Sequence, residues 1–230
     1  MRKLNDVLKQ TGKEIYREII RIALYSVISS AALVLIIFLV PTIFALVLLP
    51  LLYMPLVYGV CYAYHRKTMT GKSGLRDVLK GAVKGFGTSA LFGILCVLLG
   101  LILWSTWWYY GDKEGFMYLA IAVFQTYFVA MALVSQFYTL QLVLQEGMGI
   151  FKAMAESVKL FFRYPSYTLG ACIQVVFILV PLLLTVVGFA FLFGGIWAVY
   201  QHKVSYNVLH HEEEQGESAG TAGGHEWARS

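Results

Sequence analysis

Three glutamines interrupt long apolar stretches and are the residues best suited to bind a polar substrate: Gln125, Gln136 and Gln174. Gln125 and Gln136 are 11 positions apart, so in one continuous helix they return to the same face after three turns. Amide side chains on an apolar helix either form hydrogen bonds between helices or line a site for a polar solute. Bonding between helices is the more ordinary role. Together with Gln174 on another span, the same residues are our candidate substrate-binding residues.

Histidine is the only other side chain placed where acid–base chemistry could occur. His65 and His202 lie at the ends of apolar stretches. A lipid-acting enzyme could use them, but anchoring at a membrane interface explains them equally well. The sequence has neither a Walker P-loop nor an HExxH zinc motif. We therefore expect no enzyme activity, no catalytic residue and no cofactor.

Metal or redox chemistry has little support in the sequence. The three cysteines lie inside or at the ends of apolar stretches and lack the short spacing of metal or redox pairs; they are Cys61, Cys96 and Cys172. His210 and His211 precede three glutamates and could bind a metal weakly, but nothing fixes their geometry. We expect buried thiols, a solvated tail and no metal site.

The elements that must position these residues are membrane-spanning helices. The 230 residues are 59% hydrophobic and 13% charged, with a mean hydropathy of +0.69, whereas soluble domains are about a quarter charged. Four stretches carry no charge, and they are bounded by Arg21 and His65, Lys84 and Asp112, Glu114 and Glu146, and Arg163 and Lys203. Because a span needs about 20 helical residues, the first and last stretches hold two spans each and the others one. The sequence predicts an all-α, polytopic membrane helix bundle of six transmembrane helices.

The turn inside the first long stretch depends on prolines. A turn at Pro41 divides the stretch into two nearly equal spans, whereas a turn at Pro50 or Pro55 leaves a long span and a short one. We place the turn between residues 40 and 50, which leaves the later prolines to kink the second span. The sixth span is expected to end near Tyr200.

The basic residues predict the orientation in the membrane. With six spans, every Lys and Arg except Lys113 falls on one side of the bilayer. Lys and Arg near span ends are retained in the cytoplasm, so both termini are expected there, in the cytoplasmic membrane of a cell. Topology accounts for the net charge of +5, and no nucleic-acid partner is expected.

Two amphipathic stretches of similar sequence repeat one arrangement. Residues 74–86, GLRDVLKGAVKGF, and residues 149–161, GIFKAMAESVKLF, each lie between two apolar stretches and are too short to span a bilayer. We expect two interfacial amphipathic helices in a repeated span, amphipathic helix, span order. Residues 1–21 predict a basic amphipathic helix on the cytoplasmic side, residues 22–207 the six-span membrane domain, and residues 208–230 a disordered cytoplasmic tail.

The order of these elements resembles the YesL-like family of small bacterial integral membrane proteins. The resemblance covers roughly residues 10–207 and rests on four segments: PLLYMP, VYGVCYAYHRKTMTGKSG, LRDVLKGAVKGF and MAESVKLFFRYPSYTLG. It implies a bacterial inner-membrane protein without an assigned biochemical activity, from a family often associated with carbohydrate uptake and utilisation. It supplies no catalytic residue.

Packing and interface features occur throughout the chain, and reactive groups are absent from the predicted spans. We therefore expect a non-catalytic accessory or assembly protein of the bacterial inner membrane, linked to carbohydrate uptake or utilisation. The alternative is a carrier or channel for a neutral polar solute. The expected partners are the lipid bilayer and a permease or another membrane protein, and a homo-oligomer is compatible with the pattern.

Overall fold

The protein is built from helices throughout residues 3–185 and 192–211, the part of the chain that our computed structural model describes. The helices in chain order are α1 (Leu4–Arg17), α2 (Ile19–Leu39), α3 (Thr42–Leu48), the π-helical turn η1 (Leu49–Tyr53), α4 (Met54–Thr70), α5 (Leu75–Lys84), α6 (Phe86–Tyr110), α7 (Phe116–Ser135), α8 (Thr139–Gln145), α9 (Ile150–Arg163) and α10 (Pro165–Leu184). Residues 192–211 are also helical. The predicted all-α class is confirmed. The predicted tail begins inside this last helix, and its residues 212–230 lie outside the described residues.

Five stretches are long and apolar enough to cross a bilayer, which makes the chain an integral, multi-pass membrane protein. They are Ile19–Ile36, Phe44–Thr70, Phe86–Tyr110, Phe116–Gln145 and Pro165–Leu184. The sixth predicted span falls partly on residues 186–191, which lie outside the described residues.

The first hairpin turns where α2 meets Pro41. The helix ends at Leu39, Val40 is extended with φ −110° and ψ 129°, and α3 begins at Thr42. A proline disfavours the helical conformation of the residue before it, which explains the stop at Val40. The turn lies at the start of the predicted interval.

The second span contains the two later prolines without breaking. Pro50 lies in η1, the π-helical turn, and Pro55 lies in the first turn of α4, where a missing N–H costs little. Gly93 of α6 packs on this turn, because a Cβ there would lie 2.8 Å from the Pro50 Cα. The absence of a side chain at Gly93 thus lets α6 approach η1 closely.

The first amphipathic helix, α5, is docked on α4. Asp77 stabilises the start of α5 by accepting a hydrogen bond from the Gly74 N–H at 3.0 Å, and it forms an ion pair with Arg66 of α4. Further along, Gly59 of α4 lies against the α5 backbone, because a Cβ there would meet the Val78 carbonyl oxygen at 2.2 Å. A buried glycine thus permits direct backbone contact between the two helices.

Both predicted amphipathic helices form, and each leaves large apolar side chains exposed. Val83 of α5 is 79% exposed, and Phe151 and Phe162 of α9 are each 71% exposed. Apolar side chains of this kind beside basic ones suit a helix that lies in the membrane interface.

The candidate span Phe116–Gln145, which carries Gln125 and Gln136, is not one continuous helix. The predicted shared face of these two glutamines assumed that it was. α7 ends at Ser135 and α8 begins at Thr139. The Ser157 hydroxyl of α9 donates to the Ser135 carbonyl at 2.6 Å and accepts from the Tyr138 N–H at 3.1 Å. A side chain from α9 therefore satisfies backbone groups that the interrupted ladder leaves open, which stabilises the break.

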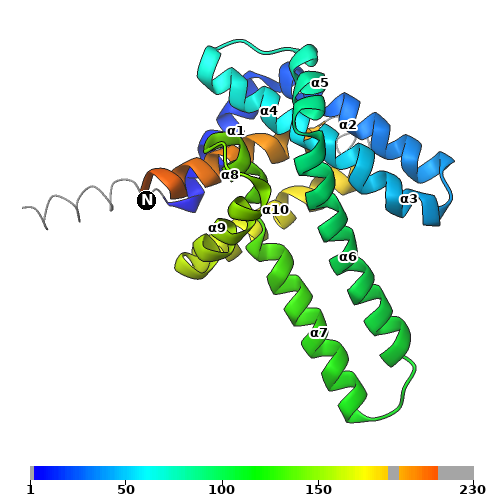
Figure 1. Cartoon of the computed structure of the whole chain (residues 1–230). Helices are drawn as coiled ribbons and strands as arrows, with labels where there is room; N and C mark the ends of the chain where they lie inside the picture. Colours follow the sequence, from blue (N-terminus) through cyan, green and yellow to red (C-terminus); the bar gives the residue numbers. More distant parts are fainter. Residues whose placement is uncertain (1–2, 186–191, 212–230) are drawn as a thin grey trace, which may run out of the picture.

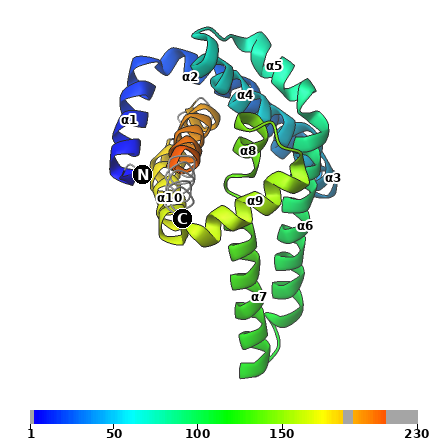
Figure 2. The same ribbon diagram turned by 60° about the vertical axis from the view of Figure 1, so that its left-hand side comes forward.

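The helical residues 192–211 pack at the centre of the molecule. Figure 2 shows them enclosed by α1, α4, α8 and α10, whereas the α6–α7 hairpin projects away from the rest. Val199, Val204 and Val208 are almost fully buried and belong to the two largest apolar clusters. The Ser26 hydroxyl of α2 accepts a hydrogen bond from the Gly195 N–H at 2.6 Å, which joins this helix closely to α2.

Candidate functional site

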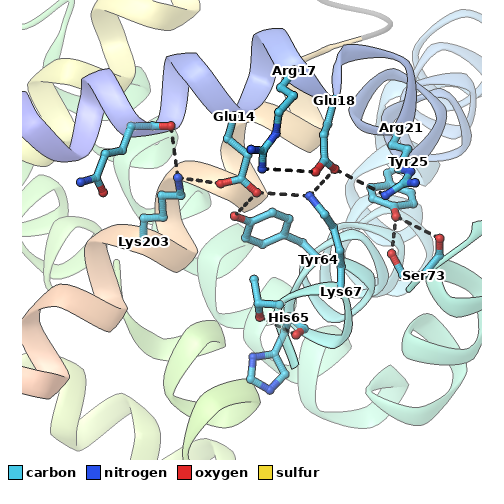
Figure 3. A network of polar contacts seen from close by, with 12 residues as sticks. Glu14, Arg17, Glu18, Arg21, Tyr25, Tyr64, His65, Lys67, Ser73 and Lys203 are labelled. Atoms are coloured by element: carbon cyan, nitrogen blue, oxygen red, sulfur yellow. Dashed lines mark hydrogen bonds and ion pairs between the residues drawn. The ribbon is translucent and has the colours of Figure 1, made fainter. Parts of the chain in front are cut away.

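A cluster of paired charges joins α1, α4 and residues 192–211 (Figure 3). The Glu14 carboxylate accepts from Lys67 at 3.2 Å, from Lys203 at 2.6 Å and from the Tyr64 hydroxyl at 3.0 Å. Lys67 also forms an ion pair with Glu18, the residue directly after α1. The cluster therefore links three segments that are far apart in the sequence.

The Glu14 carboxylate stays charged in this cluster although it is largely buried. The side chains of Glu14, Lys67 and Lys203 are 18%, 10% and 22% exposed. Burial raises the pKa of Glu14, but hydrogen bonds and positive charges from Lys203 and Lys67 outweigh it, so the pKa is lowered overall. Arg17 and Arg21 lie 3.9 Å and 3.8 Å from Glu18, so basic side chains outnumber carboxylates in this cluster.

A pair of histidines lies beside the charged cluster. The Nδ1 of His65 and the Nε2 of His202 are 3.2 Å apart, at hydrogen-bond distance. The ring of Tyr64 meets His202 edge-on at 5.2 Å, and that of Tyr206 stacks on it at 6.4 Å. Burial, and next the nearby His65, lower the pKa of His202 to about 4, so this residue, beyond the predicted end of the sixth span, is neutral at pH 7.

The neutral histidine pair leaves one donor and one acceptor unused. A neutral imidazole has one N–H and one bare nitrogen, and the bond between the rings uses an N–H of one ring and a bare nitrogen of the other. Whichever of His65 and His202 donates, one N–H and one bare nitrogen remain at the outer sides of the pair. The pair can therefore take up a proton without first breaking its hydrogen bond.

Both groups open onto a cavity of about 870 Å³, which is within the range of small-molecule sites, roughly 300–1,000 Å³. Its walls come from α1, α4, the end of α8 and residues 192–211. The polar side chains that line it are those of Gln10, Glu14, Tyr64, His65, Thr68, Gln145, Glu146, His202, Lys203, Tyr206, Asn207, His210 and His211.

A chain of glutamines leads from Gln145 on the cavity wall to the buried Gln141 and Gln201. Gln145 donates to Gln141 at 3.2 Å and to the His202 carbonyl at 3.3 Å, and Gln141 donates to Gln201 at 3.4 Å. Gln201 in turn donates to the Phe137 carbonyl at 2.6 Å. Sequence reasoning did not identify these glutamines as interior groups. The spacing of four between Gln141 and Gln145, which places both on one helix face, was the available signal.

The three glutamines predicted to bind substrate occupy separate surroundings. Gln125 is half-buried on α7, and Gln136 lies in the break after α7, where it accepts from Thr139 at 2.9 Å. Gln174 of α10 accepts from the Tyr200 hydroxyl at 2.7 Å and donates to Asn5 at 3.3 Å. None of the three lines the cavity described above. Gln174 therefore bonds across helices as a packing group does, whereas Gln136 bonds locally within the break.

The other candidate groups differ in their positions. His65 and His202, from α4 and residues 192–211, are brought together, whereas Cys61 is buried in an apolar cluster. Among the described residues no group of three His, Cys, Asp or Glu side chains has the geometry of a metal site. His210 and His211 line the cavity.

The tail also carries a short motif that sequence reasoning missed. Residues 216–220 read GESAG, which fits the G-x-S-x-G pattern of esterase nucleophiles. The pattern indicates an esterase where it joins a strand to a helix. These residues lie outside the described part of the chain, so they add nothing to the site.

No family model, no curated protein and no solved structure matches this chain.

Proposed function

We propose that the protein is a non-catalytic accessory or assembly component of a bacterial inner membrane, with both termini in the cytoplasm, that serves a carbohydrate-uptake or utilisation system. The observation that carries the non-catalytic part is the pairing of interior polar groups with one another. Glu14 is bonded to Lys67, Lys203 and Tyr64, and the buried glutamines are bonded in series. Groups bonded in this way hold helices together and do not await a substrate.

Two further features support the accessory role. The amphipathic helices α5 and α9 expose apolar side chains next to basic ones, as a helix that meets lipid or another membrane protein does. The cytoplasmic placement of the termini rests on the distribution of Lys and Arg. The link to carbohydrate uptake rests on the resemblance to the YesL-like family.

The test of this proposal is capture of the tagged protein from its native membrane in mild detergent, with mass spectrometry of the proteins retained. We expect a stoichiometric permease or another membrane protein of an uptake system. A sample stripped of peripheral proteins at high salt is the control, because contacts between spans resist salt. A pure homo-oligomer without a partner would contradict the accessory role.

The second candidate function is a carrier or channel for a neutral polar solute, and the cavity is the observation that favours it. Its wall carries amide, hydroxyl and imidazole groups; of its charged groups, Glu14 and Lys203 neutralise each other and Glu146 is exposed at the end of α8. Such a wall suits an uncharged solute better than an ion.

The two functions differ in what the purified protein does in lipid vesicles. The accessory role predicts no solute movement without partners. If uptake occurs, two variants locate the path of the solute. The triple variant Gln125→Leu/Gln136→Leu/Gln174→Leu tests the path predicted from the sequence, and Gln145→Leu tests the cavity. Uptake that either variant abolishes, with its helical circular dichroism unchanged, would overturn the accessory role in favour of the carrier.

A further inference from the structure

The histidine pair closes a contact between two helices that the sequence separates by 137 positions. One turn away from it, Cys61 of α4 packs in the same apolar cluster as Ala198. Positions four apart share a helix face, so Cys61 and His65 lie on one face of α4, and Ala198 and His202 on one face of the partner helix. The polar pair and the apolar contact therefore form one continuous interface.

The carboxylate whose charge acts on the pair is already bonded to lysines. Glu14 of α1, and Glu18 directly after that helix, are matched by Lys67 of α4 and by Lys203. Lys203 repels a proton on His202, whereas Glu14 attracts it. The remaining titratable or polar groups around the pair are Tyr64, Tyr206, His210, the Gln145 amide and the exposed Glu146 of the cavity wall. No described carboxylate forms an ion pair with either histidine, so a proton added to the pair is a partly buried charge without a bonded counter-ion, which is costly.

We propose that the His65–His202 pair is a proton-operated switch, in which acidification loosens residues 192–211 from α4. Protons reach the pair through the cavity, since both histidines line its wall. One proton binds the bare nitrogen that the pair leaves unused, and no bond between heavy atoms forms or breaks. The charge is relieved when the two helices separate and water reaches the imidazoles.

The direction of the effect follows from linkage. His202 has a pKa of about 4 in the closed arrangement and about 6.5 when its imidazole is exposed to water. Between these pH values the open form binds more protons than the closed form, so the population of the open form rises as the pH falls. Above pH 6.5 protonation does not shift the equilibrium toward the open form. At pH 5 the ratio of open to closed molecules rises on the order of tenfold over its value at pH 7.5.

The reactivity of Cys61 measures this opening, because its side chain is 1% exposed when the helices are together. Cys96 and Cys172 are replaced by alanine, so that Cys61 is the only thiol. The protein in lipid nanodiscs is treated with uncharged dithiodipyridine from pH 7.5 to pH 5. Each rate is divided by that of the denatured chain at the same pH. We expect the normalised rate to rise on the order of tenfold.

Two variants identify the histidines as the source of the effect. The doubly substituted His65→Gln/His202→Gln protein keeps hydrogen-bonding side chains but cannot titrate, and its normalised rate should not change with pH. His225→Gln, in the tail, should behave as the parent does. An equal rise in the double variant would overturn the proposal. If that variant does not fold, a normalised rate in the parent that stays constant from pH 7.5 to pH 5 overturns it alone.

Discussion

Replacing Glu14 by glutamine will lower the free energy of unfolding by about 3 kcal/mol, the low end of what removing one partner from a buried ion pair costs. The low end applies because the three side chains keep some exposure to water. Glutamine preserves the shape but leaves the Lys203 ammonium with neutral oxygens, such as the Gln10 carbonyl, and no carboxylate, whereas Lys67 retains Glu18. Reversible unfolding of the purified protein in mixed micelles, followed by circular dichroism, measures the change.

The matched control is Glu156→Gln on α9. Glu156 pairs with Lys159 at 2.9 Å, but the lysine side chain is 71% exposed. A surface pair of this kind contributes about 0.5 kcal/mol or less. Similar losses in the two variants would show that the charges in the α1 cluster are no better shielded from water than those on α9.

The Glu14 carboxylate also makes the stability of the protein depend on pH. The pKa of Glu14 is lowered from its ordinary value of 4.5, so its contribution is complete above that value and is lost as the pH falls through the lower native pKa. The histidine pair acts earlier, between pH 6.5 and about 4, because His202 resists protonation in the folded protein. The Glu14→Gln variant should lack only the more acidic of the two losses.

The features that the sequence predicts well are those that depend on neighbouring residues. Hydropathy over about 20 residues locates a span, and apolar residues at helical spacing locate α5 and α9. The stop of α2 at Pro41 is local for the same reason, since a proline constrains the residue before it. The all-α class and the two amphipathic helices follow from these signals alone.

The candidate site depends on contacts that no local pattern contains. The Lys and Arg distribution predicts that Glu14, Lys67 and Lys203 lie on one side of the membrane, but it does not predict that they meet. The break in the fourth span has a similar origin. Ser157 supplies hydrogen bonds from another helix, and this ends α7 before Gln136 and removes the helical register on which the shared glutamine face depended.

Substituting Gly59 by alanine will separate α5 from α4 and cost about 1–3 kcal/mol, the usual range for overfilling a packed contact. The new Cβ would lie 2.2 Å from the Val78 carbonyl oxygen and 3.1 Å from the Ala82 nitrogen. Both are backbone atoms of α5, so no side chain can rotate to make room and the whole helix must move. Unfolding in mixed micelles measures the loss, and faster cleavage by trypsin after Lys80 locates it in α5.

The same substitution at Gly100 of α6 provides the control, because its Cβ would meet no atom within 4 Å. Alanine is favoured over glycine inside a helix by about 1 kcal/mol, so Gly100→Ala should leave stability unchanged or raise it. The two changes add the same methyl group to a helix, and only the presence of α5 separates them. If Gly59→Ala were as stable as Gly100→Ala and as resistant to trypsin, the close approach of α4 and α5 would not hold in the membrane.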